Sequence, residues 1–297
     1  MTRSPETAGE ENAGLPFESA PPAPARRSSG PLPGLKLTLG FTVFYLGIIV
    51  LLPVAALVLR SLHLSWPQLW TLATNRRALA AYELSLGASL AAALINAVFG
   101  SLLAWVLVRY RFPGRLLLDG LVDFPFALPT AVAGLTLANL FADHGWLGRF
   151  LVPLGIRGAF TPLGVIIALT FVGLPFVVRT LQPVLENLDR DVEEAAACLG
   201  AGRARTFLGV IAPTLFPTIL TGFGLSFARA LGEYGSIKFI SGNLPRTEIA
   251  PVLMVTRLDQ YDYTGAIAVA LVLMLFSFIL LFTLNWVQGW ASKFQQP

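Results

Sequence analysis

Residues 84–108 read LSLGASLAAALINAVFGSLLAWVLV, a run of 25 residues without an acidic or basic side chain. A helix needs about 20 predominantly apolar residues to cross the hydrocarbon core of a bilayer, so this run is long enough for one crossing. Five further charge-free windows have comparable lengths: Leu37–Leu59, Phe124–Ala142, Gly158–Val178, Thr206–Ala228 and Tyr263–Trp290. Together these windows predict an all-α, polytopic membrane protein with six transmembrane helices.

The composition of the whole chain excludes an ordinary soluble enzyme. Of the 297 residues, 55% are hydrophobic and 13% are charged, whereas a soluble domain carries about 25% charged residues. The single cysteine, Cys198, excludes an internal disulfide and a cysteine-rich metal site. The net charge of +4 is better explained by membrane topology than by nucleic-acid binding.

Basic residues indicate how the chain is oriented. An even number of crossings places both termini on one side, and Arg109, Arg111 and Arg115 crowd the short loop between the second and third windows. Because short cytoplasmic loops are enriched in Lys and Arg, we predict that both termini are cytoplasmic and that the chain lies in the cytoplasmic (inner) membrane. Residues 1–34 are rich in Pro, Ala, Gly, Ser and Glu, so we expect a disordered cytoplasmic tail, followed by a membrane domain over residues 35–297.

The stretch between the fourth and fifth windows, residues 186–205, reads ENLDRDVEEAAACLGAGRAR and predicts a short helical elbow. Asp191 is a candidate N-cap with Glu194 as its capping-box partner, and Gly200 suits the end of the helix. A second short helical segment is expected over residues 203–211. The elbow would expose alanines flanked by carboxylates, a surface suited to a partner's groove, and an ordinary surface loop is the alternative.

The motif Glu194-Ala195-Ala196, followed by Gly200 and Pro213, resembles the EAA loop of the permease subunits of ABC importers. The match departs from the usual pattern at Val210, where Ile is usual, and at Ala212, where Leu is usual. The resemblance implies a type I ABC-importer permease architecture in which the loop at about 186–213 docks on a separate ATPase subunit. It also implies an ATPase-coupling set made of Glu193, Glu194, Ala195, Ala196, Gly200 and Pro213.

Three longer segments indicate which kind of permease subunit the chain resembles. Residues 123–137 (DFPFALPTAVAGLTL), 174–184 (LPFVVRTLQPV) and 228–251 (ARALGEYGSIKFISGNLPRTEIAP) resemble the T-type permease subunit of sulfate/thiosulfate importers. This resemblance implies four kinds of partner: a W-type permease, two ATPase subunits that bind the ATP, a periplasmic sulfate-binding protein and the membrane itself. Molybdate and tungstate permeases share the ALGE-type segment and are the nearest alternative.

Arg229 and Glu233 are candidates for a role in translocation. They lie four residues apart near the outer end of the fifth window, where a continuing helix would let them form a salt bridge. Ionisable residues within a membrane usually face a bundle interior or a wet pathway. We hypothesise that Arg229 sets the anion environment of the gate with Glu233 restraining it, and the alternative is a purely structural ion pair.

Further expectations concern prolines, asparagines and one threonine. Pro129 and Pro175, together with Pro125, lie inside crossings and are expected to bend them, which would shape the translocation path or only kink a helix. Asn96 and Asn139 are expected to form interhelical hydrogen bonds. Thr247 is expected to cap a short helix running to Met254, where a binding protein could dock.

The sequence contains no GxxxxGK[ST] phosphate loop and no HExxH or GxSxG signature, so we expect neither catalysis nor a bound cofactor on this chain. A function in a different class is an ion-coupled secondary carrier, which requires buried acidic residues. Asp123 and Glu233 are the candidates for that role.

Overall fold

The computed structural model describes residues 35–292, and every regular element in that range is helical. The long helices are α1 (Leu35–Ser61), α3 (Arg76–Arg109), α7 (Pro162–Glu186), α10 (Ala212–Leu231) and α13 (Tyr263–Ser292). Each is long and apolar enough to span a membrane, α10 together with the short segments that precede it. The all-α, polytopic prediction is therefore confirmed, while the tail predicted over residues 1–34 lies outside the described residues.

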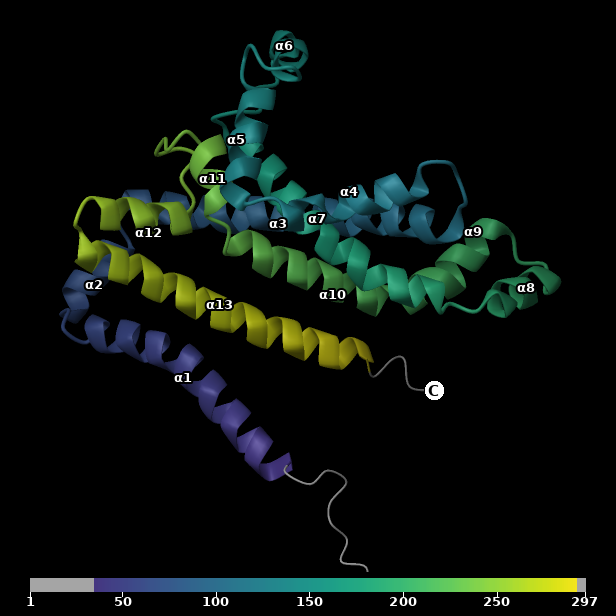
Figure 1. The fold of residues 1–297 in the computed structure, drawn as a ribbon, viewed down its shortest axis with the longest axis horizontal. Helices are drawn as coiled ribbons and strands as arrows, with labels where there is room; N and C mark the ends of the chain where they lie inside the picture. Colours follow the sequence, from purple (N-terminus) through teal and green to yellow (C-terminus); the bar gives the residue numbers. More distant parts are fainter. Residues whose placement is uncertain (1–34, 293–297) are drawn as a thin grey trace, which may run out of the picture. The chain divides into compact units, whose positions relative to one another are not determined.

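The chain divides into two compact units, residues 1–52 and 53–297. The described part of the first unit is the beginning of α1, and Pro53 inside α1 marks the start of the second unit. The second unit contains all the remaining helices, including every residue singled out above for function (Figure 1).

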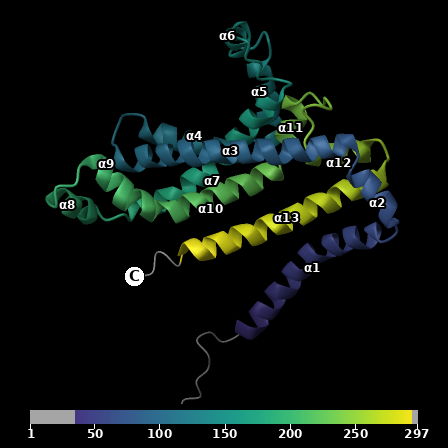
Figure 2. The ribbon, with the colours of Figure 1, turned by 180° about the vertical axis from the view of Figure 1, so that it is seen from behind.

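Helices α3, α7 and α10 pack against one another in the second unit (Figures 1 and 2). Small residues allow the close approach: a Cβ on Gly222 of α10 would stand 3.0 Å from the Cα of Val177 on α7. Asn96 of α3 donates hydrogen bonds to the Thr170 carbonyl and to Ser226 Oγ, both at 3.1 Å, so its predicted interhelical role is confirmed. Asn139 instead donates to Leu135 O one turn earlier in its own helix, so that prediction is wrong.

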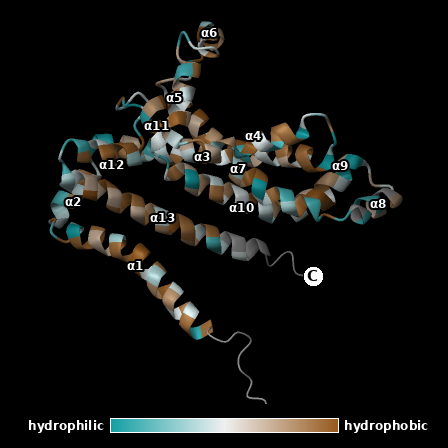
Figure 3. Cartoon of the chain, viewed as in Figure 1, coloured by the Kyte–Doolittle hydropathy of each residue, from teal (hydrophilic) through white to brown (hydrophobic). Residues whose placement is uncertain are grey.

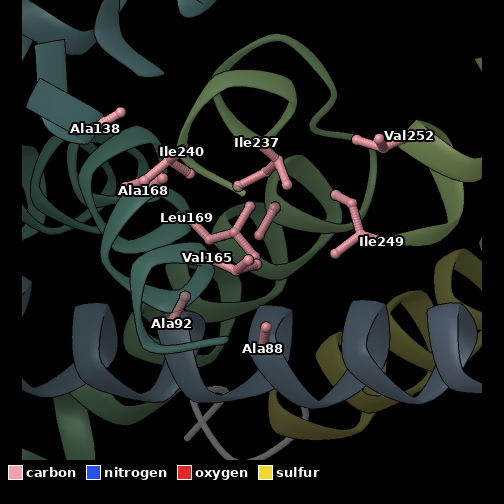
Figure 4. Close-up of a cluster of buried hydrophobic side chains, with 11 residues drawn as sticks. Ala88, Ala92, Ala138, Val165, Ala168, Leu169, Ile237, Ile240, Ile249 and Val252 are labelled. Carbon is pink, nitrogen blue, oxygen red and sulfur yellow. The ribbon is translucent and has the colours of Figure 1, made fainter. Parts of the chain in front are cut away.

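A cluster of buried apolar residues joins α3 and α7 to the short helices α11 (Gly235–Ile240) and α12 (Ala250–Asp259). Ala88 points from α3 toward Leu169 of α7, and Ile237 of α11 closes the cluster from the opposite side (Figure 4). The long helices keep apolar residues on their outer surface, as Figure 3 shows along α13. An apolar outer surface suits contact with lipid rather than water.

The third window does not form one straight crossing. Its residues fall into the end of α4 (Arg115–Ala127) and into α5 (Thr130–Phe141), and these two helices are bent by 112°. The break lies at Leu128 and Pro129 because proline lacks an amide hydrogen and drives the residue before it into extended conformation, here φ −85° and ψ 136°. Residues 35–292 therefore contain five spanning helices, or six if the bent pair counts as one crossing.

The remaining prolines named from the sequence do not break their helices. Pro125 lies within α4, and Pro175 lies within α7, which stays continuous to Glu186. The expectation of a helix beginning at Thr247 is also corrected, since α12 begins at Ala250. Thr247 Oγ1 instead donates to the carbonyls of Ser241 and Leu244 and so closes the loop before α12.

The segment expected to present a docking surface, residues 247–254, is buried up to Leu253. Helix α12 packs against α3 and α13 instead of projecting. The remaining short elements are α2 (Trp66–Ala73), α6 (Gly148–Leu151), α8 (Arg190–Cys198), α9 (Arg203–Thr206), a 3-10 turn (Val152–Leu154) and a π-helical turn (Phe207–Ile211).

Replacing Gly134 by alanine is expected to destabilise the fold by at least about 1–3 kcal/mol, the usual cost of overpacking. A Cβ on Gly134 of α5 would stand 2.2 Å from the carbonyl oxygen and 2.5 Å from the Cα of Ser236, and this backbone of α11 cannot rotate away. Thermal unfolding of the purified protein in detergent measures the loss. Gly87→Ala on α3 is the matched control, because its Cβ would meet nothing within 4 Å. Equal unfolding midpoints for the two variants would contradict this packing.

Candidate functional site

The elbow predicted between the fourth and fifth windows is helix α8, which lies beyond the ends of α7 and α10 (Figures 1 and 2). Its cap differs from the prediction. Asp189 Oδ1 accepts a hydrogen bond from the Asp191 amide at 3.1 Å, so Asp189 and not Asp191 fills the capping role. The helix begins at Arg190, which places Asp191 in the first turn, near the positive end of the helix dipole.

Gly200 ends α8 in the left-handed conformation, with φ +81°, as the sequence predicts. The amide of Ala201 reaches back to the carbonyl of Ala196 at 3.0 Å, the hydrogen bond expected of a glycine-terminated helix. The chain then passes through α9 and the π-helical turn into α10, and Pro213 lies in the first turn of α10. The elbow predicted from the sequence, a short helix ended by Gly200 and followed by a second short helical segment, is therefore present.

The two adjacent glutamates of the motif face different surroundings. Glu194 and Ala195 are exposed, so they are available to a partner. Glu193 is half-buried and faces α3, where Arg109 Nη2 lies 2.6 Å from Glu193 Oε1. The structure thus separates the predicted coupling set: Glu194 and Ala195 point outward, while Glu193 fastens α8 to the bundle.

Aromatic contacts surround the ion pair between Arg109 and Glu193. The guanidinium of Arg109 lies 5.2 Å from the ring centroid of Trp105, within range of a cation–π interaction. Trp105 in turn packs edge-on against Phe207 of the π-helical turn, with centroids 5.6 Å apart. A cavity of about 640 Å³ opens beside these residues and is also lined by Glu194 and Arg203. Sequence reasoning missed Arg109 as a partner of α8, although an arginine ending a crossing is a recognisable signal.

A second charged cluster, which was also not predicted from the sequence, joins α4 to α7. Arg179 Nε donates to Asp123 Oδ1 at 2.8 Å, and Arg179 Nη1 donates to Asp119 Oδ1 at 2.7 Å. Gln182 donates to the same Asp119 oxygen at 3.0 Å. The three charged side chains are between 32% and 51% exposed, so the cluster lies on a surface of this chain. Asp123 is therefore paired, which argues against an uncompensated acid that couples transport to an ion.

The predicted pair of Arg229 and Glu233 is present, although α10 ends at Leu231 and the pair forms across the helix end. Glu233 is buried, and its Oε1 accepts hydrogen bonds from the Ser236 amide and hydroxyl, each at 3.0 Å. Arg229 Nη1 donates to the other oxygen, and its side chain stays 32% exposed. Glu233, like Asp123, is thus compensated by an arginine.

The break in the third crossing lies beside this pair. A Cβ on Gly235, two residues after Glu233, would stand 2.2 Å from the hydroxyl of Thr130, the residue after Pro129. The structure therefore brings Arg229, Glu233 and Pro129 into one region, whereas Pro175 lies buried within α7.

Comparison with known proteins identifies the family. The protein-family model described as "Binding-protein-dependent transport system inner membrane component" matches residues 96–293 of this chain. A probable sulfate transport system permease protein cysT of Nephroselmis olivacea is 52% identical over 254 residues, covering 85% of this chain and 89% of that protein. The sulfate transport system permease protein CysT of Synechococcus elongatus is 52% identical over 255 residues, covering 86% and 92%.

A solved structure supports the architecture independently. The crystal structure of a bacterial ABC transporter involved in the import of the acidic polysaccharide alginate aligns with a TM-score of 0.72, at 15% identity, over 86% of this chain and 94% of that one. At this identity the likeness concerns the fold alone, and it confirms the predicted permease architecture. The chain therefore belongs to the binding-protein-dependent transport system inner membrane components, the multi-pass permeases of ABC importers, and within them to the CysT family.

Proposed function

We propose that this chain is the T-type permease subunit of an ATP-driven sulfate/thiosulfate importer. The observation that carries the proposal is the identity of about one half, over most of both chains, with proteins named sulfate transport permeases. We infer that the chain works with a W-type permease, two ATPase subunits and a periplasmic sulfate-binding protein. Both termini would lie in the cytoplasm, which places α8 on the side where ATP is available.

In this proposal α8 transmits the movement of the ATPase subunits to the membrane helices. Its exposed Glu194 and Ala195 are placed to contact a partner, while Glu193 connects the elbow to α3 through Arg109. Closure of the ATPases around ATP would displace α8, and the attached helices would move with it. The permeases would then open outward to accept the anion from the binding protein.

Uptake by the reconstituted complex tests the function directly. Proteoliposomes holding this chain with its candidate partners are loaded with ATP, and labelled sulfate is added with the binding protein. Uptake that requires ATP hydrolysis and is competed by unlabelled thiosulfate supports the proposal. Competition by molybdate alone would favour the molybdate/tungstate alternative, and uptake driven by an ion gradient without ATP would favour a secondary carrier.

We further propose that Arg229 contributes to the anion environment of the gate. The side chain of Arg229 is 32% exposed, and its partner Glu233 lies two residues before Gly235, which packs against Thr130 at the break; both observations support this role. Arg229→Gln alone leaves Glu233 buried without its counterion, so we expect a loss of about 3–5 kcal/mol in stability. The double variant Arg229→Gln/Glu233→Gln removes both charges, and we expect it to fold normally yet to take up sulfate about tenfold more slowly, as befits the loss of one favourable charge.

Insertion, unfolding midpoint and initial uptake rate are measured for both variants. Arg157→Gln, an exposed arginine in the loop before α7, is the matched control and is expected to behave as wild type. A double variant that restores uptake together with stability would leave the pair a purely structural role.

A further inference from the structure

A cavity of about 380 Å³ opens where the turn between α2 and α3 meets the turn between α12 and α13. Both views of the ribbon place these two turns at the same end of the bundle (Figures 1 and 2). Its lining is unusually rich in arginine and consists of Leu72, Asn75, Arg76, Arg77, Arg257, Gln260 and Asp262. Neither the elbow nor the Arg229 pair uses any of these residues.

The positive charge in this cavity is only partly neutralised. Arg77 is paired with Glu248 through two hydrogen bonds of 2.8 and 3.1 Å. Arg257 is 6% exposed, yet its nearest carboxylate oxygen, on Asp262, lies 4.0 Å from Nη1, and that nitrogen has no hydrogen bond to any described residue. Arg76 is exposed and forms no ion pair with any side chain described within residues 35–292. Three guanidinium groups thus face two carboxylates, which leaves a net positive site.

The backbone adds to this charge. Helix α3 begins at Arg76 and runs for 34 residues, and its first turn borders the cavity. Asn75 Oδ1 accepts a hydrogen bond from the Ala78 amide at 2.8 Å and from no other amide of the first turn. The other N–H groups of the first turn are therefore free to donate to an anion. The N-terminus of a long helix favours phosphate and similar anions. A buried arginine without a full complement of acceptors and a helix N-terminus therefore converge on one place.

The position of the cavity indicates which anion would occupy it. Leu72 of the lining belongs to α2, which carries two neighbouring tryptophans, Trp66 and Trp70, that are 72% and 59% exposed. Exposed tryptophans at the ends of membrane helices favour the layer of lipid headgroups. Helices α3 and α13 are long and apolar enough to span a membrane and both begin beside this cavity, so in the proposed topology its arginines lie near the headgroup layer on the periplasmic side. Clusters of basic side chains close to a membrane surface attract anionic lipid headgroups.

We propose that this cavity binds the phosphate group of an anionic phospholipid. The phosphate accepts hydrogen bonds from Arg76 and Arg257 and from the first-turn amides of α3. It gives Arg257 Nη1, which has no hydrogen bond to a described residue, an acceptor, and it ties the α2–α3 turn to the α12–α13 turn. The inference holds whichever anion the importer carries.

Lipid titration of the purified chain tests the site. The unfolding midpoint in detergent is followed as vesicles of dioleoylphosphatidylglycerol or of dioleoylphosphatidylcholine are added, and bound lipid is counted by native mass spectrometry. Phosphatidylglycerol is expected to bind and stabilise more strongly than phosphatidylcholine. Arg76→Gln, an exposed residue whose loss leaves the fold intact, is expected to weaken the apparent affinity for phosphatidylglycerol about fivefold.

One control and one further variant accompany Arg76→Gln. Arg157→Gln removes an equally exposed arginine elsewhere and is expected to leave the affinity unchanged. Arg257→Lys keeps the buried charge but removes the planar fork, and it is expected to weaken binding without unfolding the chain. Equal binding of the two lipids, or an equal loss in Arg76→Gln and Arg157→Gln, would overturn the site. Equivalent stabilisation by millimolar sodium sulfate or phosphate without lipid, lost in Arg76→Gln, would assign the site to a free oxyanion and overturn the lipid.

Discussion

Glu194→Arg is expected to lower ATP-dependent sulfate uptake by at least about tenfold while the permease still folds and inserts. Glu194 is exposed on α8 and forms no ion pair with the side chains that the structure describes, so its replacement breaks no ion pair among them. In the proposed complex the side chain contacts the ATPase subunit, and a like-charge contact at an interface costs several kcal/mol, where about 1.4 kcal/mol already corresponds to tenfold. Initial uptake rates in proteoliposomes and co-purification of the ATPase measure the effect.

The matched control for this variant is Glu186→Arg. Glu186 is an exposed glutamate at the end of α7, on the same side of the bundle, and its reversal changes the net charge by the same amount. We expect that variant to keep most of the wild-type uptake. Normal uptake and ATPase retention with Glu194→Arg would exclude α8 as the docking element for the ATPase.

Reversing either partner of the Arg109–Glu193 pair is expected to lower uptake by about tenfold or more, and reversing both is expected to restore it to within about threefold of wild type. In each single variant two like charges face each other at a position where the wild-type ions are 2.6 Å apart, with Arg109 only 12% exposed. Because Glu193 is still 32% exposed, the cost stays below the about 3–5 kcal/mol of a fully buried pair, yet about 1.4 kcal/mol already corresponds to tenfold. We infer that α8 would then detach from α3 and no longer transmit ATPase movement.

Two measurements distinguish this coupling role from simple misfolding. The ATPase activity of the complex is expected to persist in Arg109→Glu and Glu193→Arg while transport fails, because α8 still docks but is uncoupled from the bundle. Arg111→Glu, an exposed residue in the same loop, controls for the changed charge near the membrane and is expected to transport normally. A double reversal that remains as inactive as the singles would contradict a direct pairing.

Helix formation follows from the sequence because a chain segment in lipid must satisfy its backbone hydrogen bonds within itself. Charge-free length alone therefore predicts α1, α3, α7, α10 and α13. The same reasoning fails at the third window, because the sequence does not distinguish Pro129 in that window from Pro175 in the fourth. Pro175 leaves α7 continuous, whereas the chain turns by 112° at Pro129. The difference lies in packing: α5 departs to lie against α11, with Gly134 touching the backbone of Ser236.

The elbow likewise combines features that the sequence determines with contacts that only the tertiary structure decides. Its helix, its glycine turn and the proximity of its carboxylates to small alanines are local features, set by residues adjacent in the chain, so the sequence determined them. Which glutamate faces outward was decided only by the tertiary structure, because Glu193 finds its partner Arg109 on α3. Asp123 likewise meets Arg179 across 56 residues of chain. Ion pairs of this kind depend on which helix faces are brought together, and no local pattern of residues encodes that pairing.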